Sequence, residues 1–249
     1  RLVQDNLPHG KICVCFIPDE EIGHGAALLD LEKFGASYAY TVDGGAPNEV
    51  EWETFYAAAA DWSIAGVSVH PGDAKDKMVN AALVAMEING MLPPDEIPAK
   101  TQGREGFFHL CDMSGDVSAA KLSYIIRDHD AEKFSQRKQT MREIERKINE
   151  TYGAGTAALT LREQYRNMAE ILQHHPDVVE QAKRAIRAVG LTPVSNPVRG
   201  GTDGAQLSFR GLPCPNLGTG AYALHGPYEH AIAEQMDVMT EILLHIAQA

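Results

Sequence analysis

The sequence predicts an α/β domain that is interrupted by an inserted α+β domain with a ferredoxin-like fold. Between residues 53 and 162 the pattern gives the order β-α-β-β-α-β, which is the order of a ferredoxin-like sandwich. Strand and helix patterns alternate on both sides of this stretch, which is typical of an α/β domain. We therefore expect an outer domain in two parts, residues 1–52 and 164–249, and an inserted lid or dimerisation domain over residues 53–163.

The first part of the outer domain reads as strand, turn, helix, strand. Residues 11–17 and 37–42 are apolar runs, and the stretch GAALLDLEKFG between them has helical spacing and ends at Gly35. A unit of this length favours two parallel strands joined by a right-handed crossover. Because the carboxyl ends of parallel strands meet at one edge of a sheet, Glu21 and Asp43 are expected to leave the sheet close together.

The remaining elements follow from apolar spacing and from Gly and Pro positions. In the inserted domain we expect strands over residues 53–67, 105–113, 121–127 and 156–162, and helices over 74–89 and 131–152. The second helix has an apolar stripe of Phe134, Met141, Ile144 and Ile148. In the second part of the outer domain we expect helices over 177–189 and 231–247, the last with Ile232, Met236, Met239, Leu243 and Ile246 facing inward.

Composition excludes some classes of function. The 249 residues carry a net charge of −12, whereas a nucleic-acid-binding protein normally presents a basic face. No apolar stretch approaches the roughly 18 residues needed to cross a membrane, and no basic-then-apolar leader opens the chain. The four cysteines form no C-x-x-C pair, which fits a reducing cytoplasm. We expect a cytoplasmic protein without a nucleic-acid or membrane partner.

Two acidic motifs suggest metal-assisted chemistry. In PDEE, the consecutive residues Glu20 and Glu21 point in different directions, so one can bind a metal while the other acts as a general base on the metal-bound water. The alternative is a solvated acidic turn at a helix N-terminus. Asp43, in TVDGG, is a second candidate ligand, and its alternative role is that of a turn residue.

Histidines and arginines supply further candidates. His225, in HGPYEH, could bind zinc beside carboxylates, with Glu229 as its partner or as a helix cap, although most loop histidines are surface residues. His70, before Pro-Gly, could stabilise an oxyanion, or could only begin a helix. Arg127 could hold a substrate carboxylate, or could make a surface salt bridge.

The motif RGGTDGAQLS is the last candidate. This Gly-rich turn around Gly201, flanked by Arg199 and Asp203, suggests a backbone segment that binds an anion. It lacks the G-K-[ST] ending of a P-loop. A tight loop without chemical function is the alternative interpretation.

Taken together, the motifs resemble those of the tripeptide aminopeptidases of the peptidase T family, in the di-zinc aminopeptidase/carboxypeptidase superfamily. The resemblance spans nearly the whole chain and rests on FIPDEEIG, YTVDGG, VHPG, MVNA, YIIRD, RGGTDGAQLSFRGLPCPNL and HGPYEH, in this order. It implies a zinc-peptidase α/β domain with two zinc ions and a small peptide as substrate. It also implies the following roles: Glu20 as general base; Glu21, Asp43 and His225 as zinc ligands, with Glu21 and His225 on opposite metals; and His70, Arg127, Arg199, Gly201 and Asp203 as substrate-binding residues.

The resemblance implies two further metal ligands that this sequence lacks. Relatives carry a histidine in an H-x-D motif and a bridging aspartate before the strand expected at Lys11. We therefore expect this chain to be the C-terminal portion of such an enzyme, and to bind zinc weakly and be inactive alone. The alternatives are a dipeptidase, carboxypeptidase or N-acyl amino acid deacylase, or a non-catalytic fragment. The free sheet edge of the inserted domain could pair in a homodimer.

Overall fold

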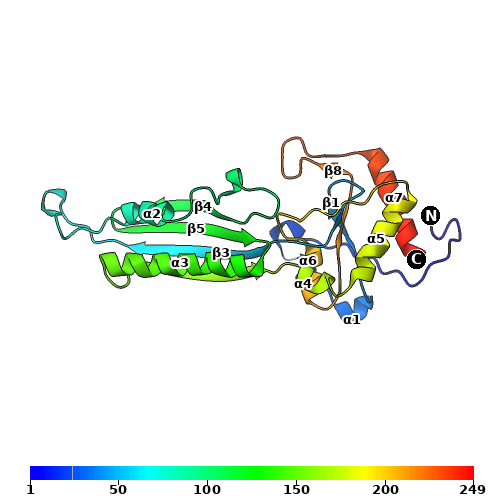
Figure 1. Ribbon diagram of the computed structural model, residues 1–249, viewed down its shortest axis with the longest axis horizontal. Helices are drawn as coiled ribbons and strands as arrows, with labels where there is room; N and C mark the ends of the chain where they lie inside the picture. The colour runs from blue at the N-terminus through cyan, green and yellow to red at the C-terminus, as the bar shows by residue number, and fades with distance from the viewer. Residues whose placement is uncertain (24) are drawn as a thin grey trace. The chain divides into compact units, whose positions relative to one another are not determined.

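The computed structural model describes residues 1–23 and 25–249 and divides them into two compact units. The outer unit contains residues 1–54 and 167–249, and the inserted unit contains residues 55–166 (Figure 1). The sequence placed these boundaries at residues 53 and 163. Among the described residues, no helix is long and apolar enough to cross a membrane.

The inserted unit is a ferredoxin-like sandwich. Its strands are β3 (Tyr56–Ala65), β4 (Phe107–Gly115), β5 (Ala119–Asp128) and β6 (Ala157–Tyr165), and its long helices are α2 (Ala81–Gly90) and α3 (Ala131–Tyr152). The strands pair in the order β4-β5-β3-β6, and all three neighbouring pairs are antiparallel. This spatial order is the one that a β-α-β-β-α-β chain adopts in ferredoxin-like folds.

One face of this sheet is apolar and packs against both helices. Along β3, Ala58, Ala60 and Trp62 are buried in the core, whereas the intervening Asp61 and Ser63 face away from it. The helix predicted over residues 131–152 is confirmed with the same bounds. Its predicted stripe is buried as expected: Phe134, Met141, Ile144 and Ile148. Burial of this stripe against the sheet holds α3 in place.

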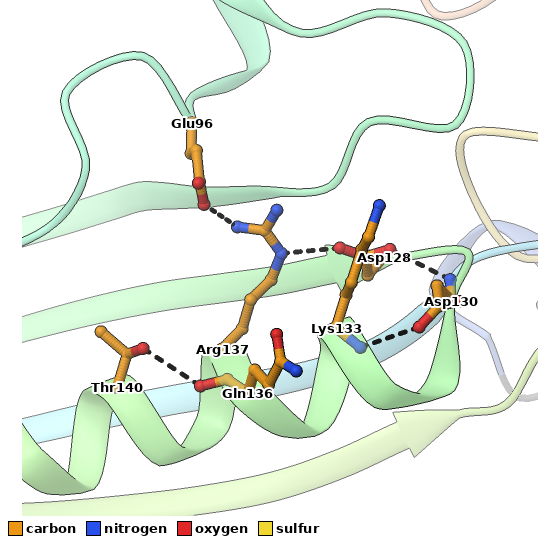
Figure 2. A network of polar contacts seen from close by, with 7 residues as sticks. All are labelled: Glu96, Asp128, Asp130, Lys133, Gln136, Arg137 and Thr140. Atoms are coloured by element: carbon orange, nitrogen blue, oxygen red, sulfur yellow. Dashed lines mark hydrogen bonds and ion pairs between the residues drawn. The ribbon is translucent and has the colours of Figure 1, made fainter.

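A buried ion pair also joins α3 to the sheet. The Arg137 Nε donates to Asp128 Oδ2 at 2.8 Å, and the same guanidinium also pairs with Glu96 (Figure 2). Asp128 is only 1% exposed, so Arg137 supplies its compensating charge.

The first helix of this unit is shorter than the sequence predicted. It was expected from residue 74 but begins at Ala81, after a short 3-10 turn, η3 (Pro71–Asp73). Val79 and Val67 exchange two backbone hydrogen bonds, which keeps residue 79 extended. The Asn80 side chain then accepts from the backbone N–H groups of residues 82 and 83 and caps the helix.

The outer unit has a small sheet with helices packed around it. Within the described residues, its strands β1 (Thr41–Gly44), β7 (Asn216–Gly218) and β2 (Val50–Glu51) lie in the order β1-β7-β2, with β1 and β7 parallel. A separate hairpin is formed by β8 (Ala221–Tyr222) and β9 (His230–Ala231). The helices are α1 (Leu31–Phe34), α4 (Ala169–Leu172), α5 (Pro176–Ala188), α6 (Asp203–Phe209) and α7 (Ala233–Ala247).

Helices α5 and α7 lie side by side in the outer unit and share one core with β2 and β7 (Figure 1). The inward face predicted for α7 was partly wrong, because Met236 is 53% exposed and Leu243 is also exposed. Met239 is buried as predicted, and Ile242 and Leu244, which were not predicted, are buried as well. The run Ile242-Leu243-Leu244 is apolar on more than one side, so spacing alone did not identify the buried face.

The strand predicted over residues 11–17 was wrong. In the part of the chain that the structure describes, no strand pairs with this segment, and Val14 and Phe16 are exposed, the latter by 93%. The parallel partner of β1 is instead β7, which is far away in the sequence. An apolar run forms a strand only where another strand satisfies its backbone groups.

The helix predicted before Gly35 is broken into two pieces. A 3-10 segment, η2 (Gly25–Leu28), precedes α1, and the Asp30 side chain caps α1 by accepting from Lys33 N–H. The end of the helix was predicted correctly, since Gly35 adopts a left-handed φ of 64° and its N–H donates to Leu31 O.

Candidate active site

Asp43 is held at the end of β1 by a tight contact between two glycine-containing turns. Thr219 donates to Gly44 O through its Oγ1 at 2.7 Å and through its backbone N–H at 3.2 Å. Gly218 passes so close to Ala46 that a Cβ atom at residue 218 would overlap the Ala46 carbonyl. The backbone on the carboxyl side of Asp43 is therefore fixed against β7.

Glu20 and Glu21 lie in a single 3-10 turn, η1 (Glu20–Ile22), rather than at the end of a strand as predicted. Asp19 before it and Gly23 after it both adopt left-handed φ values, 62° and 71°, and Gly23 N–H donates to Glu20 O at 2.7 Å. A left-handed aspartate is uncommon and occurs where the surrounding structure demands it. This turn carries both carboxylates on consecutive residues.

His225 lies in the loop between β8 and β9 and also has a left-handed backbone, with φ 61°. Its N–H donates to Glu229 Oε2 at 2.7 Å, which closes the loop. Its Nδ1 is 3.7 Å from Glu21 Oε2. The imidazole and the carboxylate, about two hundred residues apart in the sequence, thus meet as the sequence predicted.

Electrostatics shows that the acids share one small region. Burial raises the pKa of Glu20, and the charges of Asp43, Asp203 and Glu21 raise it further, while His225 lowers it. Burial also raises the pKa of Asp43, with added contributions from Glu21 and Asp203 and an opposing one from His225. Charges that shift one another's pKa lie in the same region of the outer unit. The cluster therefore favours binding of a cation.

Asp203 is the most buried member of this cluster, at 4% exposed. It is the first residue of α6, which Thr202 caps by accepting from Ala205 N–H. Its Oδ1 accepts from Ala26 N–H at 3.3 Å. A Cβ atom on Gly25 would lie 2.7 Å from Asp203 Oδ2, so only glycine lets this carboxylate approach the segment that follows η1. Burial raises the pKa of Asp203.

The other predicted substrate-binding residues lie in a loop of the outer unit and in the inserted unit. Arg199 is half-buried and Gly201 is exposed, both in the loop that precedes Thr202. His70 is exposed in the inserted unit, where its Nδ1 accepts from Gly72 N–H at 3.1 Å. Arg127 lies in β5 of that unit, donates to Ile126 O at 3.0 Å and lies over the Tyr165 ring at 5.3 Å. Their contacts with a substrate stay predictions.

Sequence reasoning missed a buried polar chain in the outer sheet. Thr41 Oγ1 donates to Asn216 Oδ1 at 2.8 Å, and Asn216 Nδ2 donates to Glu51 Oε2 at 2.6 Å. The one available signal was an asparagine inside the strand-like run PCPNLG, where an apolar residue is usual. Burial raises the pKa of Glu51, and the hydrogen bond from Asn216 opposes this shift.

The raised pKa of Glu51 predicts a pH-dependent effect of the substitution Glu51→Gln. A carboxyl whose folded-state pKa lies above its unfolded value of about 4.5 stabilises the fold less as pH rises between the two values. The amide variant has no such titration. The unfolding free energy of Glu51→Gln relative to wild type should therefore increase from pH 4.5 upward and then level off, as measured by urea denaturation of both proteins. A difference that is independent of pH would contradict this account.

The donors at this site fit a metal ion in kind but form no closed site. Carboxylates and a neutral imidazole are ordinary zinc ligands. Within residues 1–23 and 25–249, however, no three His, Cys, Asp or Glu side chains are arranged so that they could hold an ion together. Glu21 and His225 supply two donors of this kind 3.7 Å apart, and two donors do not complete a metal site.

Comparisons with known proteins identify the relatives of this chain. The model of the peptidase family M20/M25/M40 matches residues 1–249. Peptidase T of Clostridium perfringens is 50% identical over 240 residues, which are 96% of this chain and 59% of that protein. This chain thus spans about three fifths of the length of that relative.

Two solved structures have the same fold. The aminopeptidase PepT of Bacillus cereus superposes with a TM-score of 0.85 at 26% identity, covering 99% of this chain and 66% of that one. A dinuclear metal-binding peptidase of family M20 from Bacillus subtilis superposes with a TM-score of 0.66 at 17% identity, covering 94% of this chain and 63% of that one. The second likeness concerns the fold alone.

Proposed function

Because this chain belongs to the peptidase family M20/M25/M40, we propose that it contributes the catalytic acids of a metal-dependent aminopeptidase that releases the N-terminal residue of tripeptides. One observation carries the proposal: His225 lies 3.7 Å from Glu21, within a cluster that also includes Glu20, Asp43 and Asp203. The names of the similar proteins, peptidase T and aminopeptidase PepT, support the choice of substrate.

In this proposal Glu20 is the general base. Its carboxylate takes a proton from the attacking water and returns it to the leaving amine. Burial and the neighbouring acids raise its pKa, which strengthens it as a base. The adjacent Glu21 is the proposed metal ligand. In the proposed mechanism, one of the two consecutive acids is the general base and the other is a metal ligand.

Zinc, as two ions, is the proposed cofactor, with Glu21, Asp43 and His225 among its ligands. When bound, zinc supplies a water of lowered pKa and a Lewis acid for the substrate carbonyl. The dinuclear metal-binding peptidase of similar fold supports a paired site. The raised pKa of Asp43 also supports it, because neighbouring like charges are stabilised by a cation.

The substrate side of the proposal rests on the residues that the sequence motifs suggested. Asp203 and the loop that holds Arg199 and Gly201 are proposed to bind the peptide, and Arg127 to contact its carboxylate. His70 is proposed to stabilise the oxyanion that forms at the carbonyl.

Tripeptides with free and acetylated amino termini test this function in the native protein, that is, the protein purified from its natural source and not this chain by itself. With added zinc, the free tripeptide should lose its first residue, as followed by mass spectrometry, while the acetylated one stays intact. A chelator should abolish the reaction. Equal cleavage of both peptides would point to another amide hydrolase, and no cleavage of either would contradict the proposal.

A further inference from the structure

The chain of hydrogen bonds Thr41–Asn216–Glu51 crosses the whole outer sheet at the level of the acids. The three residues are direct register partners, since Thr41 lies opposite Asn216 in the parallel pair and Glu51 lies opposite Asn216 in the antiparallel one. Each side chain thus comes from a different strand. Asn216 is 1% exposed, so water does not replace either bond if it breaks.

This polar chain touches the residues that follow two of the acids. A Cβ atom on Gly44, directly after Asp43, would lie 3.3 Å from both Asn216 Nδ2 and Glu51 Oε2. A Cβ atom on Gly204, directly after Asp203, would lie 3.1 Å from Thr41 Oγ1. The backbone that carries Asp43 and Asp203 therefore packs on these side chains.

The chemistry of the three groups fixes a single arrangement. An ionised Glu51 only accepts hydrogen bonds, so the NH2 group of Asn216 must face it. The amide oxygen then faces Thr41, whose hydroxyl donates. With both ends of the amide used, Asn216 cannot rotate without leaving a buried polar atom unsatisfied.

We propose that Asn216 is a positioning residue that sets the orientation of Asp43 for metal binding, acting through its hydrogen bonds to Thr41 and Glu51 and its packing against Gly44. This inference rests on the proposed function, in which Asp43 is a metal ligand. When a residue that orients a metal ligand is mutated, metal affinity or activity typically falls by about 10–100-fold.

Exchanging the two polar groups tests the proposal. Asn216→Asp places two carboxylates where an amide and a carboxylate now lie 2.6 Å apart. The double variant Asn216→Asp/Glu51→Gln restores one donor and one acceptor with their positions swapped, and Thr41 keeps its acceptor. Glu51→Gln alone also keeps a bond, because its amide oxygen can accept from Asn216.

The measurements are zinc affinity of the native protein, by competition with a chromophoric chelator, and the thermal midpoint of the metal-free protein. Asn216→Asp should weaken zinc binding by about 10–100-fold. The double variant and Glu51→Gln should bind close to wild type. The control is Asn149→Asp in the inserted unit, which loses a hydrogen bond to Ala157 O. It should lower the thermal midpoint but leave zinc affinity unchanged.

Wild-type zinc affinity in a folded Asn216→Asp variant would overturn the proposal, as would a folded double variant that does not regain affinity. If Asn216→Asp does not fold, Thr41→Val decides, since it removes only the hydroxyl donor. It should bind zinc more weakly, and unchanged affinity would overturn the proposal. If wild type binds zinc and cleaves tripeptides while the variants match it, the positioning role alone fails. If the wild type binds no zinc, both the proposed function and the positioning role of Asn216 are wrong.

Discussion

Replacing Glu20 by glutamine is expected to lower kcat for tripeptide hydrolysis in the native protein by at least about 100-fold. Glutamine has the size of glutamate but takes up no proton at neutral pH. The change leaves Glu21, Asp43 and His225 intact, so the bound metal should remain. Rates with a free-amine tripeptide, together with metal content measured by mass spectrometry, check both parts of this expectation.

Two control variants make the result specific. Glu32→Gln changes an exposed acid in the first turn of α1 and should have wild-type activity and metal content. Glu21→Gln changes a proposed ligand and should lower metal affinity as well as activity. The assignment of Glu20 as general base would be wrong if Glu20→Gln kept most of its activity, or if it lost its metal as Glu21→Gln does.

The largest expected effect on stability comes from Arg137→Met in the inserted unit. Methionine keeps much of the apolar packing of the arginine stem over Phe108 but removes the charge that compensates Asp128. Removing one partner of a buried ion pair costs about 3–5 kcal/mol. We therefore expect a loss of about 3 kcal/mol, measured as a shift of the urea unfolding curve.

The same helix provides a matched control. Arg146 pairs with Glu150 on the exposed side of α3, so Arg146→Met should change stability by no more than about 0.5 kcal/mol. The sequence has two tryptophans, one in each unit, and Trp62 is buried in the inserted unit. In a Trp52→Phe background, fluorescence therefore follows the inserted unit alone. Equal effects of the two arginine substitutions would contradict the role given to the buried pair.

Elements were predictable where their determinants are local. The helix α3 has an apolar stripe at helical spacing, and Gly35 ends its helix because only glycine adopts the left-handed conformation easily. The segment at residues 11–17 has the same kind of local signal but no partner strand among the described residues, and its interpretation failed. Strand pairing depends on two segments, so one apolar run does not show whether a partner strand is present.

In the candidate site, too, features with local signals were predictable and features that depend on distant segments were not. The sequence suggested Glu20, Glu21, Asp43, Asp203 and His225 as candidates, but family resemblance rather than spacing connected the distant His225 to the acids. Asn216 escaped notice because its importance depends on the register of three strands, two of which lie more than 160 residues away from it in the sequence. A buried asparagine becomes meaningful only when its partners are known.

The most direct test of the proposed centre is anomalous X-ray scattering from crystals of the native protein grown with zinc. The account predicts anomalous peaks at the zinc edge about 2.0–2.2 Å from ligand atoms of Glu21, Asp43 and His225. Strong zinc peaks elsewhere, with none beside these three side chains, would contradict it.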